Sequence, residues 1–407
     1  MAVLVQKFGG TSLQSPDSIS KVVSHIKQAV EKNYKLVVVV SALGRMPDPY
    51  ATDTLLALIN RSMLSPSKRE TDLLVSCGET IASVVLSNEL QNNHLKSIAL
   101  TGAQAGIMTT SEFTQAKIKS VNTSRLLTEM DNHDVVVVAG FQGQTPEGEI
   151  TTIGRGGSDT TAAALGVALN AEKVEIFSDV NGIMTADPRV VKSARQLKIV
   201  TYSEICNLAY QGAKVIHPRA VELVMEANIP LHVRSTYSTE DGTMVTNSNI
   251  KEIPDQLITG IAHVVSITQI KITNNEGMNR FHSKVFKVMA DAGISVDFIN
   301  ITPTGMQFTI QEDSTEKAVD HLTKLGFKPE VVERCGKVSI VGDEAMGVPG
   351  IASKIVEALT EKGIQILQSS DSHTTIWVLV LEKDIMDAVN ALHDTLHLGQ
   401  VLEPVNK

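Results

Sequence analysis

The stretch VLVQKFGGTS, Val3 to Ser12, decides the fold of this chain. An apolar run leads straight into two glycines, and Ser15 followed by Pro16 suits the start of a helix. Similar apolar runs, separated by segments of helix length, lie at residues 36–40, 97–100, 135–139, 174–177 and 231–234. Because these runs are continuous rather than alternating, we predict an α/β fold with a mostly parallel open sheet and helices on both faces.

The segments between the predicted strands have the length of helices. We place helices at about residues 16–31, 68–92, 114–129, 159–170, 203–211 and 218–228. Residues 235–256 are polar, with Asp241-Gly242 and Pro254, and are typical of a hairpin and linker. The first predicted domain therefore covers residues 1–246.

A weak internal repeat follows the linker. The junction ADAGI at 290–294 matches TEKGI at 360–364. Around these junctions, strands are predicted at 267–272, 295–301, 307–310, 337–341, 365–368 and 374–381, and helices at 280–292, 315–325, 350–362 and 385–396. This pattern fits two ferredoxin-like βαββαβ units. The extra strand 257–264 precedes them, so we assign residues 265–334 to one unit and 257–264 plus 335–404 to the other.

Composition excludes several classes of protein. The 407 residues carry a formal charge of -9 and no long basic run, which argues against a nucleic-acid binder. The longest purely apolar stretches are too short to span a bilayer, so we expect no membrane segment. Cys77, Cys206 and Cys335 lie far apart without CxxC spacing. This spacing predicts neither disulfides nor a zinc site, and it favours the cytoplasm.

Two glycine-rich stretches are candidate anion sites. Residues 7–12 (KFGGTS) follow a strand, and their glycine amides and Lys7 could hold phosphate oxygens. The stretch lacks the Walker A pattern, and a tight turn with an exposed lysine would look the same. Residues 154–161 (GRGGSDTT) open a helix, where Arg155 suits bidentate recognition of a carboxylate or phosphate. A capped helix, with Asp159 complementing its dipole, is the plainer interpretation.

Three weaker signals lie in other loops. Residues 178–189 (SDVNGIMTADPR) follow a buried strand, where open α/β sheets place ligands, although a surface loop fits equally well. Ser41 ends another predicted strand, and Thr52 lies in the loop after it. Glu79 falls in a predicted helix, where a lone glutamate is usually solvated.

Together these stretches resemble the aspartate kinases of the amino acid kinase family, and the C-terminal repeat resembles their paired ACT domains. The resemblance covers essentially the whole chain. It rests on seven motifs in the family's order: KFGGTS from Lys7, VVSALG from Val39, DLLVSCGE from Asp72, VVVVAGFQG from Val135, TTIGRGGSDTTA from Thr151, EIFSDVNGIMTADPR from Glu175 and YQGAKVIHPRA from Tyr210.

The resemblance implies a role for each matching residue. Lys7 and the amides of Gly9 and Gly10 would hold the transferring phosphoryl group, with Asp159 orienting Lys7. L-aspartate would be held by Ser41, Thr52, Glu79, Arg155, Gly156, Gly157 and Ser158, with Glu79 on its ammonium and Arg155 on a carboxylate. ATP would contact Lys7, Phe8, Gly9, Gly10, Ser178, Asp179, Met184, Thr185, Ala186, Asp187, Pro188, Arg189 and Lys214. Mg²⁺ would arrive with the nucleotide, and no resident metal site is expected.

The tail would sense an amino acid, which is what the resemblance to paired ACT domains implies. Candidate effector contacts are Ser295, Val296, Asp297, Ile351, Ala352, Gln365, Ile366, Ser372 and His373. These residues could equally well only build a dimer interface, since a homodimer or higher homo-oligomer through the tail is expected. Lysine, threonine or meso-diaminopimelate are the candidate effectors, and the segment QSSDSH at 368–373 favours the diaminopimelate-sensitive type.

Two rival functions remain open on the sequence. One keeps the fold but phosphorylates N-acetylglutamate, glutamate or uridylate; those relatives generally lack a paired ACT tail. The other is a catalytically inactive amino-acid sensor, against which the intact Lys7, Arg155 and Asp159 argue. The chemistry expected of the site is simple, because a carboxylate acceptor is already ionised at neutral pH and needs no general base.

Overall fold

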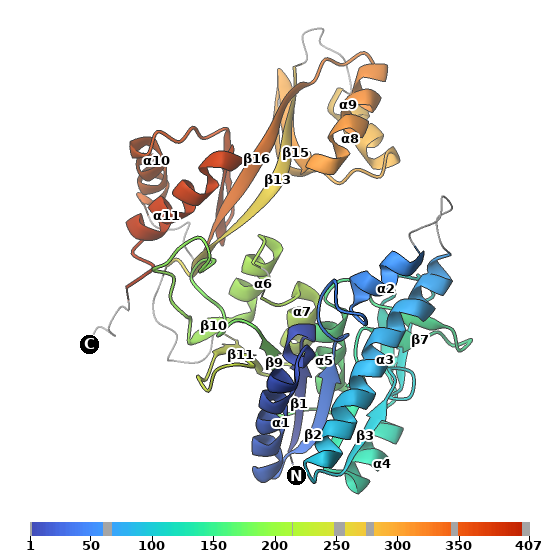
Figure 1. Cartoon of the computed structure of the whole chain (residues 1–407). Helices are drawn as coiled ribbons and strands as arrows, with labels where there is room; N and C mark the ends of the chain where they lie inside the picture. The colour runs from blue at the N-terminus through green and yellow to red at the C-terminus, as the bar shows by residue number, and fades with distance from the viewer. Residues whose placement is uncertain are drawn as a thin grey trace. The chain divides into compact units, whose positions relative to one another are not determined.

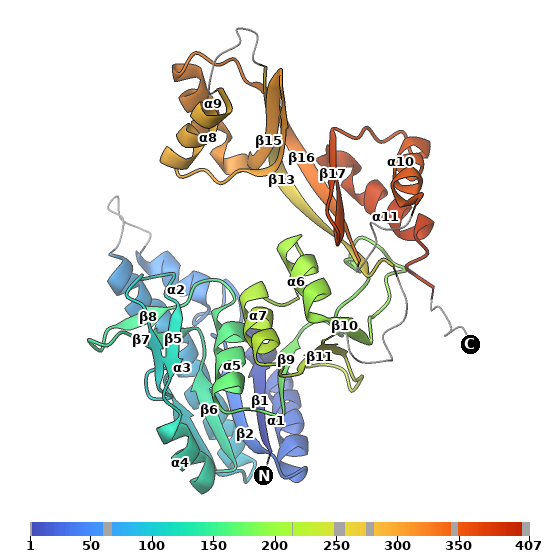
Figure 2. The same ribbon diagram turned by 180° about the vertical axis from the view of Figure 1, so that it is seen from behind.

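The computed structural model describes residues 2–59, 67–213, 215–247, 257–273, 281–342 and 349–400. The chain forms two compact units, shown in Figures 1 and 2. The first contains residues 1–183, 196–209 and 214–253, and the second contains residues 184–195, 210–213 and 254–407.

An eight-stranded sheet forms the centre of the first unit. Its strands, in spatial order, are β10 (Ile199–Thr201), β12 (Thr243–Thr246), β11 (Leu231–Ser235), β9 (Lys173–Ser178), β1 (Val3–Phe8), β2 (Lys35–Val40), β6 (Val135–Ala139) and β3 (Ser97–Leu100). Neighbouring strands are parallel except for β11 and β12. The predicted α/β class with a mostly parallel sheet is confirmed, and the carboxyl ends of β9, β1 and β2 lie side by side.

Helices cover both faces of this sheet (Figures 1 and 2). On one face, α1 (Pro16–Glu31) and α3 (Lys68–Asn92) share an apolar core with the side chains of Leu4, Phe8 and Val38. On the other face lies α5 (Gly157–Ala168), where a Cβ on Gly166 would come within 2.4 Å of Val174. The other helices are α2 (Thr52–Ile59), α4 (Ser124–Asn132), α6 (Tyr202–Tyr210) and α7 (Pro218–Glu226).

Helix α3 has the length and apolar composition of a membrane span, but 50% of that window is buried inside the protein. Its buried residues include Ala82, Leu86 and Leu90, which pack in the core beneath the sheet. Burial of this kind is expected of the core helix of a globular unit.

The predicted helix at 114–129 is wrong in its first half. Residues 118–121 form strand β5 (Ile118–Val121), which pairs with β4 (Ile107–Thr109), and α4 begins only at Ser124. These two strands join β7 (Gln142–Gln144) and β8 (Ile150–Thr152) in a small separate sheet. Met108 of β4 pairs in turn with Gln144 of β7, so the spacing within residues 114–129 could not reveal this sheet.

The second unit is built on a six-stranded sheet in the order β14-β15-β13-β16-β18-β17, antiparallel throughout. Its strands are β13 (Gly260–Thr273), β14 (Asp297–Thr302), β15 (Gly305–Gln311), β16 (Glu330–Val341), β17 (Gln368–Asp371) and β18 (Thr375–Leu381). Helices α8 (Phe281–Asp291) and α9 (Thr315–Lys324) pack against the half of the sheet that contains β15. Helices α10 (Ile351–Glu361) and α11 (Ile385–Thr395) pack against the half that contains β18.

Two long strands connect the halves of this sheet. Residues 260–264 of β13 pair with 337–341 of β16, and residues 267–273 pair with β15. The predicted strands 257–264 and 267–272 are therefore one strand that starts at Gly260, with a register shift between Val264 and Ile267. The strand predicted at 365–368 instead begins at Gln368, where pairing with β18 starts, while Ile366 packs against an apolar core.

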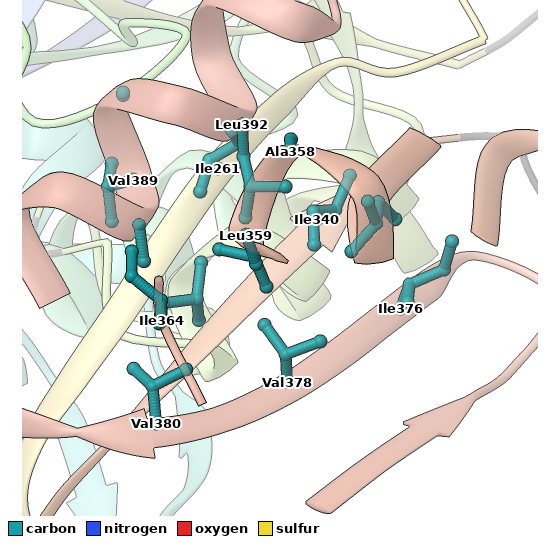
Figure 3. Close-up of a cluster of buried hydrophobic side chains, with 14 of the residues drawn as sticks. Ile261, Ile340, Ala358, Leu359, Ile364, Ile376, Val378, Val380, Val389 and Leu392 are labelled. Carbon is teal, nitrogen blue, oxygen red and sulfur yellow. The ribbon is translucent and has the colours of Figure 1, made fainter. Parts of the chain in front are cut away.

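Figure 3 shows the core of the half that contains α10 and α11, where Ile261, Val378 and Leu392 meet. Residues of the segment 184–195 belong to the same core, since Ala186 and Val191 are buried in it. The segment is also held by hydrogen bonds, from Ile261 N to Thr185 O at 2.7 Å and between Thr185 Oγ1 and His393 Nε2 at 2.9 Å. The segment 184–195 is therefore an integral part of the second unit.

Candidate active site

A lysine–aspartate pair lies at the carboxyl edge of the central sheet. Lys7 is the penultimate residue of β1, and Asp159 lies in the first turn of α5. Lys7 Nζ is 2.6 Å from Asp159 Oδ1, and both side chains are nearly buried, at 12% and 14% exposed. The helix start favours the carboxylate, which in turn fixes the ammonium at the end of β1.

A cavity of about 260 Å³ opens beside this pair. It is lined by Lys7, Ser41, Thr52, Glu79, Phe141, Gly154, Arg155, Gly156, Gly157, Ser158 and Asp159. All seven residues expected to hold the acceptor line it, although they come from the loop after β2, from α2, from α3, from the loop before α5 and from the first turn of α5. Phe141 and Gly154 were not predicted, although both lie in quoted motifs and Phe141 comes two residues after the end of β6.

Glu79 is the buried acid of this cavity. Its side chain accepts a hydrogen bond from Ala42 N at 3.1 Å through Oε1, while Oε2 has no hydrogen-bond partner among the described residues. Burial raises the pKa of Glu79 to about 8, only partly opposed by the hydrogen bond from Ala42 N. An unpaired, buried carboxyl oxygen in a cavity wall calls for a donor from a ligand.

Two glycines keep the loops of the site close together. A Cβ on Gly10 would lie 2.5 Å from Ala42 O and 2.7 Å from Gly44 O, so the β1 and β2 loops touch through backbone alone. Gly156 has φ +71, and a Cβ there would meet the His217 ring at 2.2 Å. Side chains at these positions would push the loops apart.

Asp72 is a positioning residue that sequence reasoning missed. This buried carboxylate of α3 accepts hydrogen bonds from Thr114 N at 2.9 Å, Thr152 N at 2.9 Å and Thr152 Oγ1 at 2.6 Å. It thereby ties α3 to the strand that leads into Gly154 and Arg155. An aspartate inside an apolar helix, at the start of the DLLVSCGE motif, was the available signal.

The residues predicted for ATP are spread more widely. Phe8 and Gly9 adjoin β9, since Gly9 N donates to Phe177 O at 3.3 Å. Ser178 ends that strand and Asp179 follows it. Met184 to Arg189 belong to the second unit, where Arg189 pairs with Asp187 at 2.7 Å. Lys214 lies outside the described residues.

The predicted effector residues fall in both halves of the second unit. Asp297 begins β14, directly after Ser295 and Val296, and its carboxylate pairs with Lys337 Nζ at 2.5 Å. In the other half, Ile351 is buried in the core against which Ile366 packs. The other predicted contacts there are Ala352 on α10, Gln365 after α10, and Ser372 and His373 between β17 and β18.

Comparisons with known proteins cover nearly the whole chain. Residues 2–235 match the amino acid kinase family, and residues 330–394 match an ACT domain. Aspartokinase 1 of Bacillus subtilis is 55% identical over 404 residues, covering 98% of this chain and 100% of that protein. Escherichia coli aspartokinase III solved with aspartate and ADP is similar with a TM-score of 0.80 at 25% identity, over 97% of this chain and 100% of that one. The same enzyme with lysine and aspartate gives a TM-score of 0.75 at 26% identity, over 97% and 99%.

Proposed function

The chain belongs to the aspartokinases of the amino acid kinase family, and from this premise we propose that it transfers the γ-phosphoryl group of ATP to the side-chain carboxylate of L-aspartate. The observation that carries the proposal is the cavity that places Lys7, Arg155 and Glu79 around one small space. The product is 4-phospho-L-aspartate, the first intermediate toward lysine, threonine and methionine.

The geometry addresses a problem of charge. The acceptor carboxylate and the ATP phosphates are both anions, so they repel each other as they approach. Lys7 and Arg155 bring positive charge to the cavity, and the start of α5 adds the positive end of its dipole. One bond forms, from the carboxylate oxygen to phosphorus, and the bond from phosphorus to the leaving ADP oxygen breaks. No proton has to move, so positioning and charge supply the catalysis.

Aspartate is held by complementary groups of the cavity wall. Arg155 suits the α-carboxylate through its planar pair of N–H donors. Glu79 Oε2, which has no partner among the described residues, suits the ammonium. An acceptor without an ammonium, such as uridylate or N-acetylglutamate, would leave that buried oxygen unsatisfied, which favours a free amino acid.

The acceptor is tested by trapping the acyl phosphate with hydroxylamine in the presence of MgATP. Aspartate is expected to give its hydroxamate, whereas glutamate and N-acetylglutamate are expected to give none. Phosphorylated uridylate is not an acyl phosphate and forms no hydroxamate, so uridylate is tested by ADP release, and none is expected. Product from glutamate or N-acetylglutamate alone would overturn the proposed substrate. No product from any acid, by a folded chain that binds ATP, would support the inactive sensor instead.

The raised pKa of Glu79 predicts a pH dependence for aspartate. In the free enzyme this carboxyl is neutral below about pH 8, and binding an ammonium requires it to lose the proton. We expect kcat/KM for aspartate to rise by up to tenfold per pH unit below about 8 and then to level off. Initial rates at limiting aspartate and saturating ATP measure it. The same profile for kcat/KM of ATP serves as the control, and an identical rise there would exclude Glu79 as its cause.

The nucleotide, its metal ion and the cellular compartment are also proposed. The Escherichia coli relative solved with ADP supports a nucleotide donor, and we propose ATP, with Ser178 and Asp179 at the end of β9 and the motif residues Met184 to Arg189 and Lys214 as contacts. Within the described ranges, no group of three or more His, Cys, Asp or Glu side chains is arranged to hold a metal ion. We propose that Mg²⁺ enters as MgATP, bound mainly by phosphate oxygens, as is usual for kinases. A cytoplasmic location is proposed from the free cysteines.

The second unit is proposed to regulate the kinase by binding an amino acid. Its match to an ACT domain and the lysine complex of the Escherichia coli relative support this role. Lysine, threonine and meso-diaminopimelate remain candidates, with the nine predicted residues around Asp297 and α10 as contacts. A homodimer is proposed through this unit, because the edge strand β14 exposes Ile299 and Ile301 by 46% and 52%.

Asp297 offers a direct test of the effector site. Its side chain is 67% exposed although it pairs with the nearly buried Lys337, so the carboxylate remains accessible to an effector ammonium. Asp297→Asn should shift the inhibition curve to at least tenfold higher effector concentration, the loss expected for one charged hydrogen bond. Asp320→Asn, on the surface of α9, is the control. Equal inhibition of both variants by all three amino acids would remove Asp297 from the site.

A further inference from the structure

An exposed arginine of the first unit, Arg45, reaches across the glycine loop that follows β1. Arg45 lies in the loop after β2, and its Nη2 is 3.3 Å from Oδ2 of Asp179, which follows β9. In the sheet, β1 lies between β2 and β9. The side chain that joins the outer two loops must therefore pass over the loop after β1, which contains Gly9 and Gly10.

The backbone of Arg45 is fixed, whereas its guanidinium is not. Gly44 N donates to Gly10 O at 3.0 Å, which ties the β2 loop to the glycine loop. Asp48 Oδ2 accepts from Arg45 N at 3.0 Å and from Gln14 Nε2 at 2.9 Å, which closes the turn. The Arg45 side chain is nevertheless 71% exposed and that of Asp179 48% exposed. An ion pair between such groups contributes little free energy, so a stronger anion can displace Asp179.

The loop after β2 also lies next to the sites proposed for both substrates. Its two ends supply Ser41 and Thr52 to the wall of the acceptor cavity, and Arg45 lies between them in sequence. On its other side, Arg45 contacts Asp179 at the end of β9, where the nucleotide is proposed to lie. The loop that carries Arg45 therefore adjoins both the acceptor cavity and the end of β9, where the nucleotide is proposed to lie and negative charge gathers during transfer.

We propose that Arg45 is a ligand of the β- and γ-phosphates of ATP, released from Asp179 when MgATP binds. This inference rests on the kinase function proposed above. The guanidinium presents two parallel N–H donors that match phosphate oxygens. It joins Lys7 and Arg155 as a third cation at the carboxyl edge of the sheet and screens the charge that the acceptor carboxylate meets.

The test compares Arg45→Ala and Arg45→Lys with Arg125→Ala, an exposed arginine of α4 paired with Glu129. At saturating aspartate, Arg45→Ala is expected to lower kcat/KM for ATP by about 100-fold. Arg45→Lys should recover part of this loss, because lysine restores the positive charge but not the two parallel N–H donors of the guanidinium. Arg125→Ala should match the wild type. Thermal unfolding verifies that each variant is folded.

Nucleotide binding separates a phosphate contact from a structural role. Calorimetric titration with AMP, ADP and ATP should show a loss in Arg45→Ala that grows with each added phosphate, with AMP affinity unchanged. Equal losses for all three nucleotides, or variants indistinguishable from Arg125→Ala, would overturn the proposal. ADP and AMP binding needs no acceptor, so the series tests Arg45 even if the chain phosphorylated an acid other than aspartate.

Discussion

Lys7→Met is expected to lower kcat by about 1,000-fold while leaving the protein folded. Lys7 Nζ is held 2.6 Å from Asp159 Oδ1 at the cavity where two anions must meet. Its loss removes a cation that stabilises the transferring phosphoryl group. It also leaves the Asp159 carboxylate unpaired, which adds repulsion for both substrates. Single-turnover rates at saturating ATP and aspartate measure the effect on the transfer step.

A double variant tests whether the pair acts as a unit. Lys7→Met combined with Asp159→Asn removes the unpaired charge, so its activity should equal or exceed that of Lys7→Met alone. Lys21→Met, which removes a surface lysine paired with Asp17 on α1, should behave as the wild type. Multiplicative losses in the double variant would show that Asp159 acts independently of Lys7, contrary to the role proposed for it.

Glu175→Gln is expected to lower the free energy of unfolding by about 3 kcal/mol. Glu175 is a buried residue in the middle of β9, and it has polar neighbours on both adjacent strands. Oε2 accepts from Gln6 Nε2 at 2.8 Å, and Oε1 lies 2.8 Å from Lys173 Nζ and 3.6 Å from Arg234 Nη1. Neutralising the carboxyl would leave these cations beside a group without compensating charge.

The pH dependence of stability gives this prediction a second readout. Burial alone would raise the pKa of Glu175, but the adjacent His232 ring, the charge and contact of Lys173 and the hydrogen bond from Gln6 hold it well below its usual range. A folded-state pKa below the unfolded value of about 4.3 gives stability at neutral pH that is lost as the pH falls below that value. Urea unfolding between pH 7 and 3 should therefore show a smaller acid loss in the variant.

An exposed glutamate provides the control. Glu226→Gln on α7 should change the unfolding free energy by no more than about 0.5 kcal/mol. If Glu175→Gln is as stable as this control at pH 7, the charge of Glu175 contributes nothing to the fold. In that case its hydrogen bonds alone would account for its burial.

The location of several site residues could be predicted from sheet geometry, whereas their roles were predicted from the family resemblance. Lys7 lies near the end of β1, Ser41 follows β2 and Arg155 precedes α5, and the cavity brings them together. Glu79 was predicted only through the family resemblance. Its burial depends on Ala42 and the β2 loop packing above α3, which no local pattern encodes. Asp72 and Phe141 were missed for the same reason.

The parallel sheet, its glycine loops and the repeated βαββαβ pattern could be inferred from the sequence alone, because strand runs and turn residues are local signals. The contacts between distant segments could not: β4 with β7, both halves of β13 with β16, and residues 184–195 with the core of the second unit. The tertiary structure likewise decided the electrostatics, since the raised pKa of Glu79 and the reach of Arg45 to Asp179 depend on what surrounds each side chain. Burial and long-range contact are properties of the folded chain, and no run of neighbouring residues contains them.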